Sequence, residues 1–336
     1  MGLRIVGLKT LGARIGRAAL GLGVAALLSA PALAQGKVWR HGIIEAKSDA
    51  GILYMASKRD FAQKLGLKLE FVPLKTDTIG LKAAIAGELD SFEGGPGGSI
   101  VAAARGADVK IIGCSWVVVP HGVFVRDNIS AMADLKGKSI AVSAPGSFPE
   151  LVAKAALEQA GMAVGDVKFA SMGSDTDRYK ALAAGVVDGA IVSNEYLPIA
   201  AKSGIKELVA GSKAVPNFVR VCLHATGKTL SARHDDAVKF LAAEMEGLRY
   251  AMSHRDEAIA ITHEITGSKA DDQRPAFVFD WAVKAQAVAP DLPIPMDKLD
   301  YMQNQLVKAG SMPAPIDLAK VIDGSIREKA SSLAGM

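Results

Sequence analysis

Short β-rich runs alternate with helical patterns along residues 37–226, and this alternation limits the fold more than any other feature. Two strands joined by a covering helix usually lie parallel in one sheet. The pattern therefore predicts an α/β chain with parallel sheets and helices packed on them. Strands are predicted at 38–45, 67–73, 89–93, 109–114, 122–125, 139–142, 167–171 and 189–192, and helices at 51–65, 78–86, 99–105, 148–160 and 176–184.

The strand-like runs stop after residue 230, and helical patterns continue. Apolar residues recur there at steps of three and four, which predicts an amphipathic helix. These residues are Val238, Leu241, Met245, Leu248 and Met252. Further helices are predicted at 255–266, 271–286 and 296–309. The connections at 114–121 and 219–226 are strand-like, so we expect two short crossing segments that act as a hinge.

A weak internal repeat is consistent with two similar lobes. Residues 84–90 (AIAGELD) and 183–188 (AAGVVD) share the order small residue, Gly, any residue, aliphatic residue, Asp. Any joint that runs from a helix through a glycine into a strand gives the same order. The repeat alone leaves both readings open.

The first 34 residues have the features of a secretory signal peptide. Residues 1–17 are basic without an acidic residue, 18–30 form a short apolar run, and Ala32-Leu33-Ala34 is a cleavage motif. A membrane anchor needs about 20 apolar residues, which is longer than this run. No Cys follows the run and no twin-Arg pair is present, so we expect the general secretion route, cleavage after Ala34 and a periplasmic location.

Removal of this segment changes the charge balance. The chain has 39 basic and 35 acidic residues, and residues 1–34 hold four of the basic ones, which leaves 35 against 35. A neutral mature chain gives no basic patch for nucleic acid. Its 302 residues suffice for two domains. An oxidising compartment permits a disulfide between Cys114 and Cys222, but free buried thiols on strands are the expected state.

Ligand sites in such sheets lie beyond the carboxyl ends of the strands. That rule selects loops at 47–49, 75–77, 93–98, 144–148, 173–176 and 193–196. The candidate ligand-binding residues are Lys47, Ser48, Thr76, Glu93, Gly94, Gly95, Ser115, Trp116, Gly146, Ser147, Phe148, Ser174, Asp175, Ser193, Asn194 and Glu195.

Each candidate also has a structural explanation. Gly146 and Ser147 open a predicted helix whose N-terminus attracts anions, yet Ser147 and Glu150 have capping-box spacing. Lys47 is the best cationic candidate for contact with the ligand, and the alternative is that its side chain is simply solvated. The glycines at 93–98 line a cleft wall or form a plain turn. Ser174 and Asp175 could cap a helix, and Trp116 and Phe148 could sandwich a flat ligand or belong to the core.

Several segments resemble a known family. They are AIAGELD at 84–90, GADVKIIG at 106–113, DLKGKSIAV at 134–142, Pro-Gly-Ser at 145–147 and ALAAGVVD at 181–188. With the leader, they make the chain similar to substrate-binding proteins of nitrate, sulfonate and taurine ABC importers. That family is related to thiamine-precursor-type proteins.

The resemblance implies a periplasmic-binding-protein type II fold, with lobe one at 35–118 plus 223–336 and lobe two at 119–222. It also implies capture of a small organic anion between the lobes by a monomer that serves an inner-membrane ABC permease, without a cofactor. An alkyl sulfonate, taurine, nitrate or an aromatic carboxylate would suit a neutral chain. A pyrimidine or thiamine precursor is the alternative ligand.

A secreted enzyme on the same fold is the rival hypothesis. The enzymatic branch of the family carries a Cys-rich motif, and this chain has two isolated cysteines. Its six histidines are scattered, with no H-E-x-x-H and no G-x-S-x-G, so no catalytic or metal-binding residue is assigned. A ligand-sensing domain of a regulator is disfavoured because we identify no DNA-binding segment or second membrane span.

Overall fold

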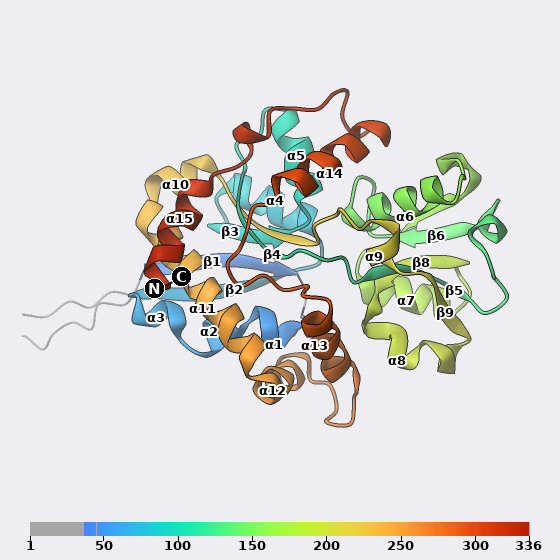
Figure 1. Cartoon of the computed structure of the whole chain (residues 1–336), viewed down its shortest axis with the longest axis horizontal. Coiled ribbons are helices and arrows are strands. Elements are labelled where there is room, and N and C mark those ends of the chain that lie inside the picture. The colour runs from blue at the N-terminus through green and yellow to red at the C-terminus, as the bar shows by residue number, and fades with distance from the viewer. Residues whose placement is uncertain (1–36, 45, 336) are drawn as a thin grey trace, which may run out of the picture. The chain divides into compact units, whose positions relative to one another are not determined.

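The computed structural model describes residues 37–44 and 46–335, so the predicted signal peptide lies outside the described residues. The strands form two five-stranded sheets (Figure 1). The first sheet has the order β2-β1-β3-β10-β4. Its strands are β1 Lys37–Ile44, β2 Leu67–Leu74, β3 Ser91–Gly94, β4 Lys110–Trp116 and β10 Val221–Ala225.

The second sheet has the order β7-β6-β8-β5-β9 and takes its strands from one continuous stretch of chain. They are β5 His121–Arg126, β6 Ser139–Val142, β7 Lys168–Ser171, β8 Gly189–Ser193 and β9 Ile205–Val209. The chain therefore passes from the first sheet to the second between β4 and β5, and returns before β10. The first passage falls in the predicted crossing segment 114–121, whereas the return covers 210–220 and overlaps the predicted segment 219–226 only at its end.

The α/β class is confirmed, but the prediction of purely parallel sheets is wrong. In the first sheet β10 runs antiparallel to both β3 and β4. In the second sheet β5 runs antiparallel to β8 and β9. In each sheet the antiparallel pairs involve β5 or β10, which is the first strand after the chain has passed from one sheet to the other. The edge strand β9 was not predicted, and its side chains are mostly half-buried.

The predicted helices agree with the structure except near residue 60, and the helices at 197–200, 211–214, 227–232 and 324–333 were not predicted. The single helix predicted at 51–65 is three short turns, because the chain breaks after Leu53 and again at Asp60, whose φ is 54°. The α-helices are α1 Ala50–Leu53, α2 Met55–Lys58, α3 Phe61–Lys64, α4 Asp77–Ala86, α5 Pro96–Ala104, α6 Phe148–Gln159, α7 Asp175–Ala183, α8 Leu197–Ala200, α9 Gly211–Ala214, α10 Gly227–Ala232, α11 His234–Ser253, α12 Arg255–Thr266, α13 Arg274–Lys284, α14 Met296–Lys308 and α15 Gly324–Leu333.

Helices cover both faces of each sheet. In the second sheet α6 and α7 pack on opposite faces and contribute to separate apolar clusters (Figure 1). In the first sheet α11 covers one face with Phe240 and Leu241, and α5 covers the other with Ile100. Helix α14 contacts both α5 and α6, and its Leu306 belongs to the cluster that contains residues of both sheets.

Cys114 and Cys222 form a disulfide between β4 and β10, so the expectation of free thiols is wrong. Both cysteines are fully buried on neighbouring antiparallel strands, although 108 residues separate them in sequence. The pairing depends on the return of the chain to the first sheet, which sequence spacing does not show. The disulfide joins the two strands that lead to and from the second sheet.

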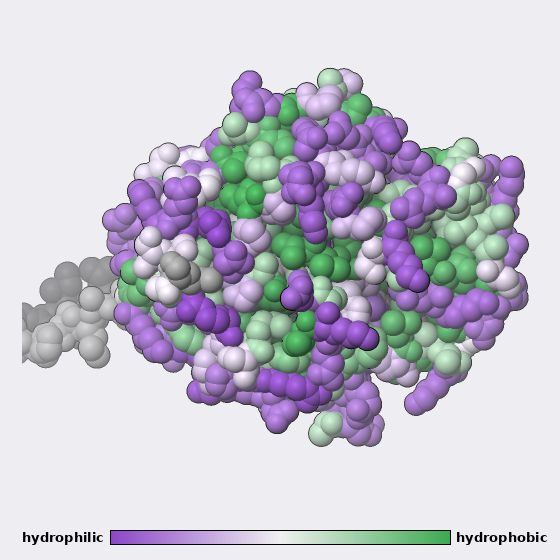
Figure 2. Space-filling view, viewed as in Figure 1, coloured by the Kyte–Doolittle hydropathy of each residue, from purple (hydrophilic) through white to green (hydrophobic). Residues whose placement is uncertain are grey.

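Hydrophobic residues at the surface are divided into patches by hydrophilic residues on the face that Figure 2 shows. Among the described residues, no helix is both long and apolar enough to cross a bilayer.

Candidate functional site

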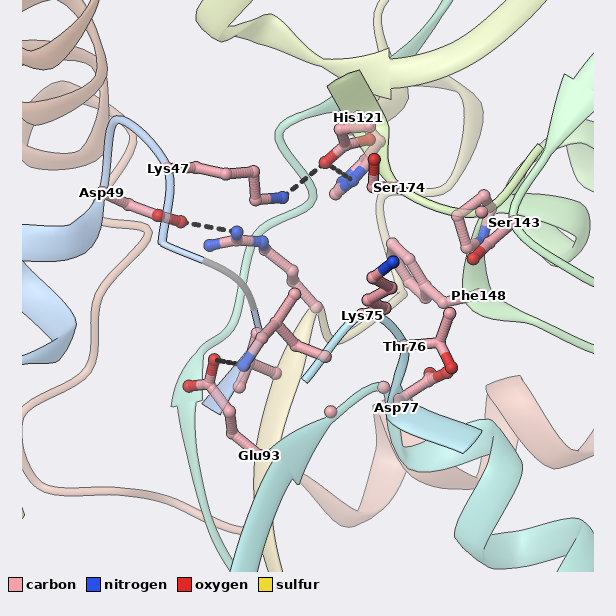
Figure 3. Close-up of a pocket in the computed structure, with 18 of the residues that line it drawn as sticks. Lys47, Asp49, Lys75, Thr76, Asp77, Glu93, His121, Ser143, Phe148 and Ser174 are labelled. Atoms are coloured by element: carbon pink, nitrogen blue, oxygen red, sulfur yellow. Dashed lines mark hydrogen bonds and ion pairs between the residues drawn. The ribbon is translucent and has the colours of Figure 1, made fainter. Parts of the chain in front are cut away.

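A cavity of about 160 Å³ lies where the facing edges of the two sheets meet. One water molecule needs only about 10–15 Å³ of such volume, so the space suits a small solute. Figure 3 shows the side chains converging on it from both sheets. The lining residues are Ile44, Ala46, Lys47, Asp49, Leu53, Lys75, Thr76, Asp77, Glu93, Gly94, Gly95, His121, Ser143, Phe148, Pro149, Gly173, Ser174, Asp175, Thr176, Arg178, Arg220 and Val221.

Asp175 is the centre of one buried charge cluster. Its carboxylate pairs with Lys47 from the first sheet and with Arg178 on its own helix, and it lies 3.4 Å from Nε2 of His121. Burial alone would raise the pKa of Asp175, but Lys47, Arg178 and His121 together hold it well below its usual range. The carboxylate is therefore ionised and joins loop 46–49 to the start of α7 (Figure 3).

Lys47 and His121, which lie beside Asp175, each have a defined protonation state at pH 7. Burial would lower the pKa of Lys47, but the Asp175 carboxylate raises it above the ordinary value, so Lys47 is cationic. Burial lowers the pKa of His121 to about 4 in spite of Asp175, so the ring is neutral at pH 7. Nδ1 of His121 is buried and has no hydrogen-bond partner in the described part of the chain.

Arg220 is the centre of a second cluster, on the segment that returns to the first sheet. Its Nη2 donates to Oδ2 of Asp49 at 2.6 Å, and its guanidinium lies 4.3 Å from the centroid of the Trp116 ring. Burial would raise the pKa of Asp49, but Arg220 and then Lys47 lower it. Nη1 of Arg220 has no partner among the described residues, although the side chain is only 7% exposed.

Three further ionisable groups line the cavity without an ion pair to any described residue. Burial raises the pKa of Asp77 above its ordinary value. Burial, with a contribution from Asp49, raises the pKa of Glu93 to about 7. Lys75 is exposed and makes no hydrogen bond or ion pair in the described structure. The cavity wall therefore offers the cation of Lys75, which is unpaired among the described residues, and, at Glu93, a carboxyl that is only partly ionised at pH 7.

Half of the residues predicted from the sequence line this cavity. The predicted residues that line it are Lys47, Thr76, Glu93, Gly94, Gly95, Phe148, Ser174 and Asp175. The predicted residues that do not line it are Ser48, Ser115, Trp116, Gly146, Ser147, Ser193, Asn194 and Glu195. Ligand contact by either group stays a prediction.

Most residues outside the lining are engaged by the protein itself. Ser48 donates to Glu195 at 2.6 Å through its hydroxyl. The Gly146 N–H donates to the Glu150 carboxylate at 2.6 Å, so the predicted capping by Glu150 occurs one residue earlier. Ser147 Oγ accepts from the Ala144 N–H instead of capping α6.

The other residues of this group are buried near the cavity. The Trp116 ring packs against the Arg220 guanidinium, and Ser193 Oγ accepts a hydrogen bond from the Glu195 N–H. Ser115 and Asn194 are buried, and each has a side-chain oxygen with no partner in the described part.

The loop rule missed His121 and Arg220. Both come immediately before or at the start of an antiparallel strand, because β5 begins at His121 and β10 begins after Arg220. The start of an antiparallel strand lies at the same edge as the carboxyl ends of its neighbours, as the pairing of Cys222 with Gly94 shows. The strand-like hinge segments were the signal that could have identified both residues. Asp49, Lys75 and Asp77 were inside the selected loops but were not chosen.

No group of three or more His, Cys, Asp or Glu side chains among the described residues is arranged to hold a metal ion. The histidines at 41 and 224 lie in the core of the first sheet. Burial lowers the pKa of His41 to about 3 and that of His224 to about 4.

A family model described as "NMT1/THI5 like" matches residues 47–258, which is nearly two thirds of the chain and includes every residue that lines the cavity except Ile44 and Ala46. The chain belongs to the NMT1/THI5-like family. A relative of this NMT1/THI5-like protein in Brucella abortus, named only as a binding protein, is 28% identical over 243 residues, which cover 70% of this chain and 73% of the relative.

Solved structures show that this family member has the periplasmic-binding-protein fold. The alkanesulfonate-binding protein SsuA of Xanthomonas axonopodis pv. citri, bound to MOPS, aligns with a TM-score of 0.71 and 18% identity, covering 85% of this chain and 98% of that one. The periplasmic aliphatic sulphonate binding protein SsuA of Escherichia coli aligns with a TM-score of 0.68 and 21% identity, covering 85% and 92%.

An enzyme shares the fold as well. The desulfurization enzyme DSZB aligns with a TM-score of 0.62 and 15% identity, covering 88% of this chain and 99% of the enzyme. At this identity the likeness concerns the fold of the NMT1/THI5-like chain and not its chemistry.

Proposed function

We propose that this protein is the periplasmic substrate-binding component of an ABC importer and that it captures a small organic anion in the cavity between its sheets. One observation carries the proposal. Arg220 is held rigidly by Asp49 and Trp116 at the cavity wall, and its Nη1 lacks a partner among the described residues. A buried guanidinium N–H without an acceptor is costly, and a bound anion would supply that acceptor.

The charges around the cavity support an anion over a cation. Asp49 and Asp175 are already neutralised by Arg220, Lys47 and Arg178. Lys75 has no partner in the described structure, and burial raises the pKa of Glu93 to about 7, which reduces its negative charge at pH 7. A single negative charge is therefore the best match to this wall.

Apolar side chains form the rest of the wall and suit the organic part of the ligand. Ile44 and Val221 come from strands of the first sheet, Leu53 from α1, and Phe148 and Pro149 from α6. Burial of such a group contributes roughly 25 cal/mol per Å². Alkyl sulfonates, taurine and aromatic carboxylates fit this description better than nitrate, and MOPS bound to the Xanthomonas relative is a sulfonate of this kind.

The lobes of the proposal are 35–118 with 223–336, and 119–222. Polar contacts join them beside the cavity, namely the ion pairs of Lys47 with Asp175 and of Asp49 with Arg220 and the hydrogen bond of Ser48 with Glu195. These contacts support closure of the lobes over a ligand about the hinge segments, as a ligand-driven population shift.

Export completes the proposal. The leader at 1–34 would direct secretion and be cleaved after Ala34, and the Cys114–Cys222 disulfide favours an oxidising compartment. The partner would be an inner-membrane ABC permease, and the protein would act as a monomer.

The experiment that tests the function is a thermal-unfolding panel on the mature protein. The panel contains ethanesulfonate, taurine, nitrate, benzoate and a thiamine-precursor pyrimidine. We expect one or a few anions to raise the melting temperature by mass action. If the pyrimidine alone raises it, the ligand class is wrong, and if nothing does at millimolar concentration, the function is wrong.

The enzyme alternative makes a different prediction. Its best feature is His121 beside Asp175, which resembles an oriented base. However, among the described residues no serine or threonine hydroxyl hydrogen-bonds His121, and the Ser174 hydroxyl donates to Asp177 at 2.7 Å. Conversion of any stabilising anion by the purified protein, followed by mass spectrometry, would establish the enzyme instead.

A further inference from the structure

Glu93 is a buried carboxyl in the wall of the proposed anion site. It lies at the end of β3, is 3% exposed and lines the cavity beside Gly94. Its Oε1 accepts the Ile44 N–H at 3.0 Å, as the dashed line in Figure 3 shows. No described Lys, Arg or His lies within ion-pair distance of it, in contrast to Asp49 and Asp175.

The surroundings of Glu93 compensate a negative charge only in part, because burial and Asp49 raise its pKa more than Arg220, the Ile44 N–H and Lys47 lower it. Behind it, Glu244 from α11 is buried, interacts with it electrostatically, and has an Oε1 without a partner in the described part. Burial and the nearby Glu93 raise the pKa of Glu244 well above its usual range. The ionisable groups that face Glu93 or pack around its strand are Asp49, Lys47, Arg220, Tyr54, Asp77, Glu244, His41 and His224.

Only two of these groups are cations, and each already forms an ion pair with an aspartate. Lys47 pairs with Asp175, and Arg220 pairs with Asp49. His41 and His224 are neutral because burial lowers their pKa values to about 3 and about 4. An anion bound at Arg220 would add a second negative charge beside the Glu93 carboxylate in a space of low dielectric, where like charges repel strongly.

We propose that binding of the anion is coupled to uptake of one proton at Glu93, whose hydroxyl then donates a hydrogen bond to the ligand. The inference rests on the proposed function and deepens it, since the solute would enter the cavity together with a proton. Glu93 thereby acts as a specificity residue, because its hydroxyl favours ligands that place a hydrogen-bond acceptor next to it.

The direction of the pH dependence follows from the charges. The pKa of Glu93 in the free protein is raised to about 7 by burial and by Asp49. A bound anion raises it further, so affinity is constant well below pH 7 and falls by up to about tenfold per pH unit above it. Binding is therefore about tenfold weaker at pH 8 than at pH 6.

Calorimetry of ethanesulfonate binding in phosphate and in Tris buffer tests the coupling, because the ligand does not titrate between pH 6 and 8. The two buffers differ in ionisation enthalpy, and the difference in observed heat gives the protons taken up. For the unmodified protein we expect about half a proton per anion at pH 7. Glu93→Gln should take up none and should bind at pH 8 as tightly as the unmodified protein does at pH 6.

The control variant is Glu158→Gln, which removes an exposed carboxyl on α6 that pairs with Lys308. It should keep both the proton uptake and the pH dependence. Anion binding without proton uptake, or proton uptake that survives in Glu93→Gln, overturns this inference alone. Absence of ethanesulfonate binding at pH 6, together with silence of the whole anion panel, overturns the proposed function instead.

A second measurement guards against a variant that misfolds. Carbon NMR of the glutamate side-chain carboxyls in the ligand-free protein follows the titration of Glu93 directly, with Glu93→Gln used only to assign the signal. We expect a titration midpoint near 7. A midpoint near the ordinary value of 4.5 would overturn the inference, whichever ligand the protein binds.

Discussion

Replacement of Glu93 by Gln should stabilise the ligand-free protein at alkaline pH, because it removes an ionisable carboxyl from the central strand of the first sheet. The carboxyl has an ordinary pKa of 4.5 and a folded-state pKa of about 7, raised by burial and by Asp49. Below pH 4.5 it is protonated in both states and makes no pH-dependent contribution. Between 4.5 and 7 only the unfolded state ionises, so folding stability falls as the pH rises.

The size of the loss follows from the shift. Each pKa unit corresponds to about 1.4 kcal/mol, so the free energy of unfolding falls by about 3 kcal/mol across this window and stays low above pH 7. Solvent screening does not reduce this free-energy difference, because Glu93 is only 3% exposed. Gln can still accept the Ile44 N–H and carries no charge at any pH, so its variant escapes the loss.

The assay is urea unfolding of the mature, ligand-free proteins at pH 5 and pH 8. Glu93→Gln should exceed the unmodified protein by about 3 kcal/mol at pH 8 and by less than about 1 kcal/mol at pH 5. Glu158→Gln should show no such trend. A Glu93→Gln variant that is equally or more strongly destabilised at pH 8 than at pH 5 would refute the reasoning, because the buried carboxyl would then be stabilising when ionised.

Three further predictions concern the frame of the site. Asp175→Asn should lower the free energy of unfolding by about 3–5 kcal/mol in urea, because Lys47 and Arg178 lose their buried counter-charge, whereas Asp177→Asn on the exposed side of α7 should cost much less. Reduction of the Cys114–Cys222 disulfide should cost about 2–5 kcal/mol, seen as a lower melting temperature with dithiothreitol, and the double Ala variant should not respond to the reductant. Protein exported from a bacterial host should begin at Gln35 by intact mass, and a mass that retains residues 18–30 would contradict export by a cleaved signal peptide.

The sequence was a good guide to the elements and a partial guide to the site. The strand and helix patterns at 67–73, 139–142 and 255–266 match β2, β6 and α12, since each has an uninterrupted period. The helix predicted at 51–65 failed because Asp60 takes a left-handed conformation that periodicity does not reveal. The glycine-rich turn at 93–98 is partly helical, since Pro96 is well tolerated in the first turn of α5.

The site depended on contacts that only the fold creates. Lys47 was identified as a cation near the ligand, but its pairing with Asp175 joins residues 128 positions apart in the sequence. Arg220 and His121 were missed because antiparallel return strands bring their first residues to the ligand edge. The disulfide was missed for the same reason, since the return strand β10 places Cys222 beside Cys114.

The central claim is that Arg220 receives the negative charge of a small ligand. Its most direct test is a calorimetric titration of the panel's best anion into Arg220→Gln and into the matched control Arg105→Gln, whose exposed arginine ends α5. A charge-assisted hydrogen bond contributes about 1.5–3 kcal/mol, so affinity should fall roughly 10- to 100-fold in Arg220→Gln and stay unchanged in the control. Equal affinity in both variants, with Arg220→Gln still folded, would contradict the account.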